Sequence, residues 1–80
     1  MISGSTGRDL RAARESAHLA QEHVAAVLGV AISRLRSIER MDLVDTFTVA
    51  QYQRALAVLV GLRRQAGRRV VQAARMAAEI

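Results

Sequence analysis

The stretch QEHVAAVLGVAISRLRSI, residues 21–38, decides the fold, because a single glycine interrupts a long apolar run. Gly29 follows a helical apolar face, and a glycine can adopt the left-handed conformation that ends many helices without a side-chain clash. We therefore expect two short helices joined by a tight turn, the first beginning near Gln21 and the second covering about Ile32–Arg40. The residues expected to face inward are Val24, Ala25, Leu28, Val30, Leu35 and Ile38.

The residues before this stretch predict a further helix, over about residues 7–17. Thr6 can cap its N-terminus, and Asp9, three residues later, supplies an acidic partner for the first turn. An apolar stripe at helical spacing consists of Leu10, Ala13, Ala17 and then Leu19.

A fourth helix is predicted after residue 47. Thr48 and Gln51 have the spacing of a capping box, and Phe47 and Tyr52 occupy the positions of a hydrophobic staple. Gly61 is expected to end or bend this helix. The inward stripe would be Val49, Tyr52, Leu56 and Leu59, so Tyr52 is predicted to be a core residue rather than a platform for stacked bases.

The segment LRAARESAHLAQEHVAAVLGVAISRLRSIER, residues 10–40, resembles the helix-turn-helix family of phage repressors and Cro-like proteins, also called the XRE family. The apolar, small and glycine positions of that motif are met by Val24, Ala25, Leu28, Gly29, Val30, Leu35 and Ile38. The resemblance covers about Leu10 to Leu59 and implies an all-α, lambda-repressor-like domain of about five helices. We therefore expect a DNA-binding domain over residues 1–60 and a C-terminal extension helix over residues 61–80.

The resemblance also implies a buried structural ion pair, between Arg14 and Glu39, that ties the first helix to the third. The sequence departs from the family pattern at several turns. His18 stands where glycine is common, so the first inter-helix turn is expected to be built differently. Ala20 and Ala31 cannot cap helices as serine or threonine would, and MDLVDTF, residues 41–47, is longer than the usual loop.

The charge of the chain favours a polyanionic partner. The formal net charge is +5, and all twelve basic residues are arginine. Codon usage in a GC-rich genome would also favour arginine over lysine, but residues 61–80 hold five arginines against Glu79 alone. A basic protein with a basic C-terminal segment is typical of nucleic-acid binding.

Residues 61–80 form one apolar stripe on a helix, consisting of Leu62, Ala66, Val70, Ala73, Ala77 and Ile80. We expect this segment to be the dimerisation element, with its off-stripe arginines free to face DNA. Two alternatives stay open: the segment packs back on its own domain, or it lies on a membrane or folds on a second protein partner.

The resemblance implies that the third helix enters the major groove of duplex DNA. The residues expected to approach base edges are Ala31, Ile32, Ser33, Arg34 and Ser37, and those expected to meet phosphates are Gln21, Arg36 and Arg40. The predicted function is a transcriptional regulator, most simply a repressor, acting as a homodimer on a palindromic operator. The alternatives are an antitoxin-like protein that binds DNA and a toxin, and an interaction module that has lost DNA binding.

Other classes of function lack support in the sequence. There is no cysteine, no glycine-rich phosphate loop and no grouping of nucleophile, base and acid, so we expect neither an enzyme nor a cofactor or metal. No apolar run has the length of a membrane span and no signal peptide is evident, so we expect a cytoplasmic protein, nucleoid-associated when bound to DNA.

Overall fold

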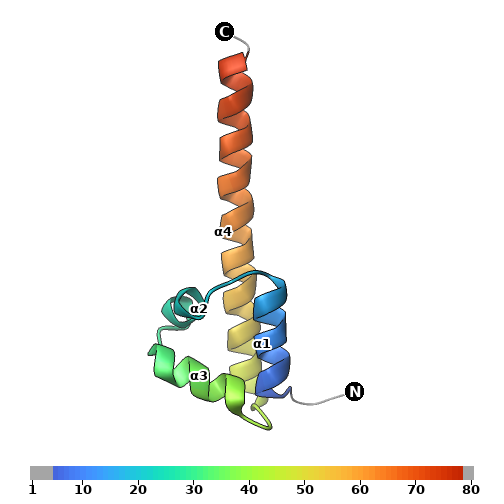
Figure 1. Ribbon diagram of the computed structural model, residues 1–80, viewed down its shortest axis with the longest axis vertical. Helices are drawn as coiled ribbons and strands as arrows, with labels where there is room; N and C mark the ends of the chain where they lie inside the picture. The colour runs from blue at the N-terminus through green and yellow to red at the C-terminus, as the bar shows by residue number, and fades with distance from the viewer. Residues whose placement is uncertain (1–4, 79–80) are drawn as a thin grey trace.

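The computed structural model describes the backbone of residues 5–78 and the side chains of residues 5–67. This part of the chain is all-α and contains four helices: α1 (Gly7–Ser16), α2 (Gln21–Leu28), α3 (Ile32–Arg40) and α4 (Thr46–Ala78). Figure 1 shows α1, α2 and α3 gathered around the first half of α4, whose second half projects beyond them. The prediction of an all-α chain is confirmed. We expected about five helices, and the described residues contain four, because the predicted fourth helix and the predicted C-terminal extension form the single helix α4.

The local sequence signals at the ends of α1, α2 and α3 act as predicted. The Thr6 hydroxyl accepts a hydrogen bond from the Asp9 amide, and the Asp9 carboxylate accepts one from the Thr6 amide, which completes a capping box for α1. Gly29 adopts a left-handed conformation with φ of 71° and ends α2. Ala20 and Ala31 stand at the N-caps of α2 and α3 without any side-chain cap, as expected from their identity.

The turn between α1 and α2 corrects one expectation. His18 itself adopts the left-handed conformation, with φ of 56°, so the turn has the backbone that a glycine would give it. A residue with a Cβ is disfavoured there. The turn is supported from α4, because the Arg63 guanidinium donates to the carbonyl oxygens of Ala17 and His18 at 2.7 and 2.9 Å.

The start of α4 was predicted wrongly. Asp45, not Thr48, is the capping residue: its carboxylate accepts from the Thr48 amide at 3.0 Å and from the Thr48 hydroxyl at 2.6 Å. These bonds lower the pKa of the Asp45 carboxyl, the hydroxyl bond most. The staple is also wrong, because Phe47 is 70% exposed while Tyr52 is fully buried.

The end of α4 was also predicted wrongly. The helix continues through Gly61 and Gly67 to Ala78 without a break, so the predicted boundary between residues 60 and 61 falls inside it. At about 1.5 Å per residue its 33 residues span roughly 50 Å. A glycine costs only about 1 kcal/mol in a helix interior, which is too little to end a helix whose neighbours are mostly good helix formers.

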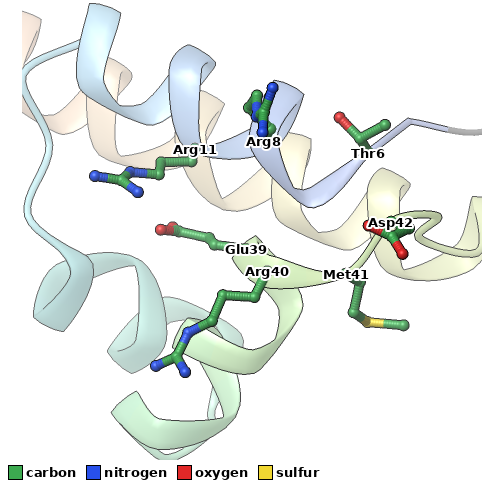
Figure 2. A pocket seen from close by; sticks show the side chains of 7 residues that line it. All are labelled: Thr6, Arg8, Arg11, Glu39, Arg40, Met41 and Asp42. Carbon is green, nitrogen blue, oxygen red and sulfur yellow. The ribbon is translucent and has the colours of Figure 1, made fainter.

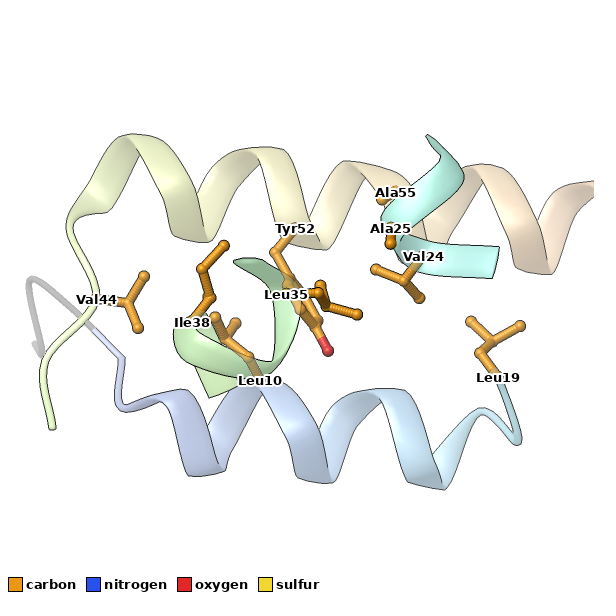
Figure 3. Close-up of a cluster of buried hydrophobic side chains, with 9 residues drawn as sticks. All are labelled: Leu10, Leu19, Val24, Ala25, Leu35, Ile38, Val44, Tyr52 and Ala55. Carbon is orange, nitrogen blue, oxygen red and sulfur yellow. The ribbon is translucent and has the colours of Figure 1, made fainter. Parts of the chain in front are cut away.

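The hydrophobic core lies where α1, α2 and α3 meet the first half of α4 (Figure 3). It is formed by Leu10, Leu19, Val24, Ala25, Leu35, Ile38, Val44, Tyr52 and Ala55. Leu28, Val30, Val49, Leu56 and Leu59 pack against it in part, which agrees with the predicted inward faces, whereas Ala13 is exposed. Val44 was missed because it belongs to the loop between α3 and α4.

Gly7 explains how closely α1 approaches the end of α3. A Cβ built on Gly7 would lie 2.6 Å from the carbonyl oxygen of Glu39, and closer still to that of Ile38. The Gly7 amide also donates to the Met41 carbonyl at 2.8 Å, and the Val44 amide donates to the Ser5 carbonyl at the same distance. The long loop therefore pairs with the segment before α1 and holds α1 against α3.

Gly7→Ala is expected to lower the free energy of unfolding by roughly 1–3 kcal/mol, because the added methyl group meets backbone atoms that must shift. Gly61→Ala is the matched control: a Cβ there meets nothing within 4 Å, so alanine should stabilise α4 by about 0.5–1 kcal/mol. Urea unfolding followed by circular dichroism measures both. Equal stability of the two variants would contradict the close approach.

Candidate functional site

A cluster of four polar side chains joins all four helices beneath α3, and we name it the Glu39 network. It consists of Arg14 on α1, Gln21 on α2, Glu39 on α3 and Tyr52 on α4. Arg14 donates to Glu39 twice, from Nε to Oε2 at 2.8 Å and from Nη2 to Oε1 at 3.2 Å, and this two-point contact matches the fork of the guanidinium to the carboxylate. The predicted ion pair is therefore present, and both residues are buried.

The buried hydrogen-bonding groups of the network are also satisfied. The Tyr52 hydroxyl donates to Glu39 Oε2 at 2.6 Å, and Gln21 Nε2 donates to Glu39 Oε1 at 3.0 Å. Arg14 Nη1 donates to the Leu19 carbonyl at 2.9 Å. Within the described part of the chain, every buried side-chain nitrogen and oxygen has a partner. The network therefore fixes the position of α3 against the other three helices.

The pKa values in the network follow from these contacts. Burial alone would raise the pKa of Glu39, but the hydrogen bonds from Arg14, Tyr52 and Gln21 outweigh it and leave this pKa below its ordinary value. The hydrogen bond to Glu39 raises the pKa of Arg14. Burial, and then the hydrogen bond to Glu39, raise the pKa of Tyr52 well above 10. Glu39 and Arg14 are thus held charged and Tyr52 neutral across the physiological range.

The opposite side of α3 is open to solvent, and we name this surface the α3 face. Its exposed residues are Ser33, Arg34, Arg36, Ser37 and Arg40, with Ala31 exposed at the preceding N-cap. Ile32 is only half-buried, so part of its side chain stays accessible at the start of the helix. The Ser37 hydroxyl donates to the Ser33 carbonyl at 3.1 Å, one helical turn earlier. All five residues predicted to approach bases therefore lie at or beyond the start of one short helix.

The three arginines of the α3 face carry no ion pair with any carboxylate among residues 5–67. Glu39 is the one acidic residue of α3, and its charge is already matched by Arg14 in the interior. The α3 face is consequently positive, and its guanidinium groups are available to an anionic partner.

Gln21 begins α2, as predicted, and its side chain is partly engaged inside the protein. Its side chain is half-buried and bridges Glu39 to the α3 face, because Gln21 Oε1 accepts a long 3.4 Å hydrogen bond from Arg36 Nε. What remains for an outside ligand is the second hydrogen of its amide group and the uncapped start of α2. Residue spacing could not show this bridge, which spans 18 positions to Glu39.

Sequence reasoning also missed the Tyr52 hydroxyl as a member of the network. The sequence contains one tyrosine, which was predicted to be buried, and a buried tyrosine usually finds a partner for its hydroxyl, so a hydrogen bond from Tyr52 could have been predicted. Arg63 was expected to stay free for DNA, but its guanidinium is bound to the end of α1.

The second half of α4 was the predicted dimerisation element. Leu62 and Ala66 are exposed, and Leu62 is 56% accessible, so the extension does not pack back on its own domain at these positions. The other predicted dimer residues, Val70, Ala73, Ala77 and Ile80, lie outside the residues whose side chains the structure describes.

None of the helices in the described part of the chain is both long and apolar enough to cross a lipid bilayer. Comparisons of the chain with protein-family models, with curated proteins and with solved structures find no match.

Proposed function

We propose that this protein is a sequence-specific duplex-DNA-binding regulator of transcription, most simply a repressor that acts as a homodimer. The observation that carries the proposal is the α3 face: a short helix, fixed from behind by the Glu39 network, presents to solvent serines and arginines that have no carboxylate partner among the described residues. A helix of this kind fits the major groove, where base edges display a full donor and acceptor code. The helix-turn-helix resemblance of residues 10–40 points to the same function.

Each residue of the α3 face has a proposed role. Arg34 has the fork of donors that suits a guanine edge, and the accessible part of Ile32 suits a thymine methyl group. Ser33 and Ser37 would contact neighbouring bases, with Ala31 close to the same bases. Arg36 and Arg40 would meet phosphates, and Gln21 would hold a phosphate with the amide hydrogen that Glu39 leaves free.

Selection of bound sequences from random duplex DNA tests the proposal directly. A palindromic preferred site, bound with an affinity that falls steeply as salt rises, is the expected result. A protein that binds no duplex even at low salt would instead be an interaction module that has lost DNA binding.

Arg34→Ala is expected to cost roughly 1–3 kcal/mol of binding free energy on the preferred site and to relax preference at one base pair of each half-site. Arg40→Ala is the contrast, because loss of a phosphate contact weakens all duplexes about equally. Fluorescence anisotropy with the preferred site and with single-base variants measures both. If Arg34→Ala lowers affinity uniformly on every sequence, α3 contacts only the backbone of the duplex.

The exposed extension of α4 favours a second candidate, an antitoxin-like protein that binds DNA through α3 and a toxin through α4. Leu62 and Ala66 stand on a helix face that no other described residue covers, which suits a protein partner. Copurification of a second small protein from the native host would favour this candidate over the homodimer.

A further inference from the structure

A cleft opens between the start of α1 and the end of α3 (Figure 2), and none of the residues predicted to contact bases lines it. Its volume is about 490 Å³. Figure 2 shows Arg8 and Arg11 on α1 and Arg40 at the end of α3, with Glu39 between the two helices. The cleft is lined by Thr6, Arg8, Arg11, Glu39, Arg40, Met41 and Asp42.

The charges in this cleft do not cancel. Glu39 lies 6% exposed at the back of it and is already paired with Arg14. Arg11 shares its charge with Glu15 in an exposed pair at 2.7 Å, while Arg8 and Arg40 have no carboxylate partner among the described residues. Asp42 is the one lining carboxylate outside the buried pair, so the two unpaired guanidinium groups of Arg8 and Arg40 exceed the unpaired carboxylates of the cleft by one positive charge.

Arginines that line one cleft suit one class of ligand in particular. A guanidinium presents several donors in a plane, which matches the oxygens of a phosphate group, and it stays charged at every physiological pH. The start of α1 adds nothing to this, because the side chains of Thr6 and Asp9 already cap it. Binding of a phosphate in this cleft therefore depends on the arginine side chains alone.

We propose that this cleft binds a phosphate group through Arg8, Arg11 and Arg40, and that the phosphate belongs to the backbone of duplex DNA held against α3. The choice of DNA rests on the proposed function. Arg40 joins the two surfaces, since residues 33, 37 and 40 repeat at helical spacing along α3. A strand that runs along the α3 face therefore continues past Arg40 into the cleft. A free phosphorylated small molecule offers the same chemistry, and the experiment separates the two sources.

The first arm compares the full-length chain with Arg8→Ala and with Arg54→Ala as the matched control. Both variants remove one exposed arginine from a helix, but Arg54 lines a hollow with Val27 and Val58 on another surface. Binding of the selected duplex is measured by anisotropy between 50 and 200 mM salt. Arg8→Ala should reduce the log–log salt slope by about 0.9. The ratio of the unmodified chain's affinity to that of Arg8→Ala should then fall about 3- to 4-fold between 50 and 200 mM salt. Arg54→Ala should leave the slope unchanged, and thermal unfolding of both variants confirms that they are folded.

The second arm uses the unmodified chain without DNA. Inorganic phosphate is titrated while the Nε–Hε signals of the arginines are followed by NMR. Saturable shifts of the Arg8, Arg11 and Arg40 signals, without a shift of Arg54, support a phosphate site.

The two arms distinguish failure of the cleft from failure of the proposed function. If duplex binds and Arg8→Ala behaves like Arg54→Ala, the cleft is not part of the DNA-binding surface and this proposal is overturned while the function stands. If no duplex binds but phosphate still shifts the three arginines, the phosphate site stands with a free phosphorylated molecule as its ligand. The assignment to DNA and the proposed function then fail. If phosphate shifts nothing and no duplex binds, both proposals are wrong.

Discussion

Glu39→Ala is expected to lower the free energy of unfolding by roughly 3–5 kcal/mol, because it leaves the buried Arg14 guanidinium without its partner. The same change removes the acceptor of hydrogen bonds from Tyr52 and Gln21. Small domains are stable by only about 5–15 kcal/mol, so this single change removes much of the total. Urea unfolding followed by circular dichroism gives the value.

Two comparisons make this measurement specific to the buried pair. Arg11→Ala breaks the exposed pair between Arg11 and Glu15 on α1 and should cost at most about 0.5 kcal/mol. Replacing both Arg14 and Glu39 by methionine and leucine should cost less than Glu39→Ala alone, since no buried charge is then left unpaired. A cost of Glu39→Ala no larger than that of Arg11→Ala would show that the network does not hold α3.

The same network predicts how stability depends on pH. The pKa of Glu39 is lower in the folded protein than in the unfolded chain, so its contribution is complete above the unfolded value of about 4.3. That contribution is lost as pH falls through the lowered pKa of the folded state. Tyr52 acts in the opposite direction: its pKa is raised, so stability falls as pH rises above about 10. Glu39→Gln should flatten the acid limb and Tyr52→Phe the alkaline limb.

If the protein is the proposed homodimer, Leu62→Asp is expected to convert it into a monomer and to lower affinity for the preferred operator far more than affinity for random duplex. A specific site is typically bound about 10³- to 10⁷-fold more tightly than other DNA. A monomer that contacts one half-site keeps only part of this preference. A homodimer on a palindromic site needs its two α3 helices about 34 Å apart, which is one turn of duplex.

Arg64→Ala is the matched control for this variant. Each of the two changes lowers the net charge by one, and both positions are exposed, but Arg64 lies about 160° to 200° around the helix from Ala66 and Leu62. Sedimentation velocity measures the oligomeric state, and anisotropy measures binding. A Leu62→Asp protein that remains a dimer with unchanged operator affinity would place the interface elsewhere. Truncations should end after Gly67, because removal of Arg63 would also uncap α1.

The parts of the candidate site that depend on residues close in sequence could be predicted. The spacing around Gly29 predicted α2, the turn and α3, and these fixed which residues α3 exposes. The pair of Arg14 and Glu39 came from the family resemblance, since nothing local links residues 25 positions apart. The prediction of where α4 begins was wrong because Asp45 and Thr48 are both good capping residues. In the structure Asp45 caps α4, Tyr52 is buried and Phe47 is exposed.

The sequence by itself determined α1, α2, α3, the left-handed turn at Gly29 and most of the inward faces, because capping, glycine conformation and apolar periodicity act within a few residues of the chain. Only the tertiary structure decided that Gly7 must lack a side chain, that Gln21 turns toward Glu39 and that Arg63 supports the turn at His18. It also brought Arg8 and Arg11 to the same cleft as Arg40. These contacts join residues from 18 to 46 positions apart, and their distances depend on how whole helices pack rather than on any local preference.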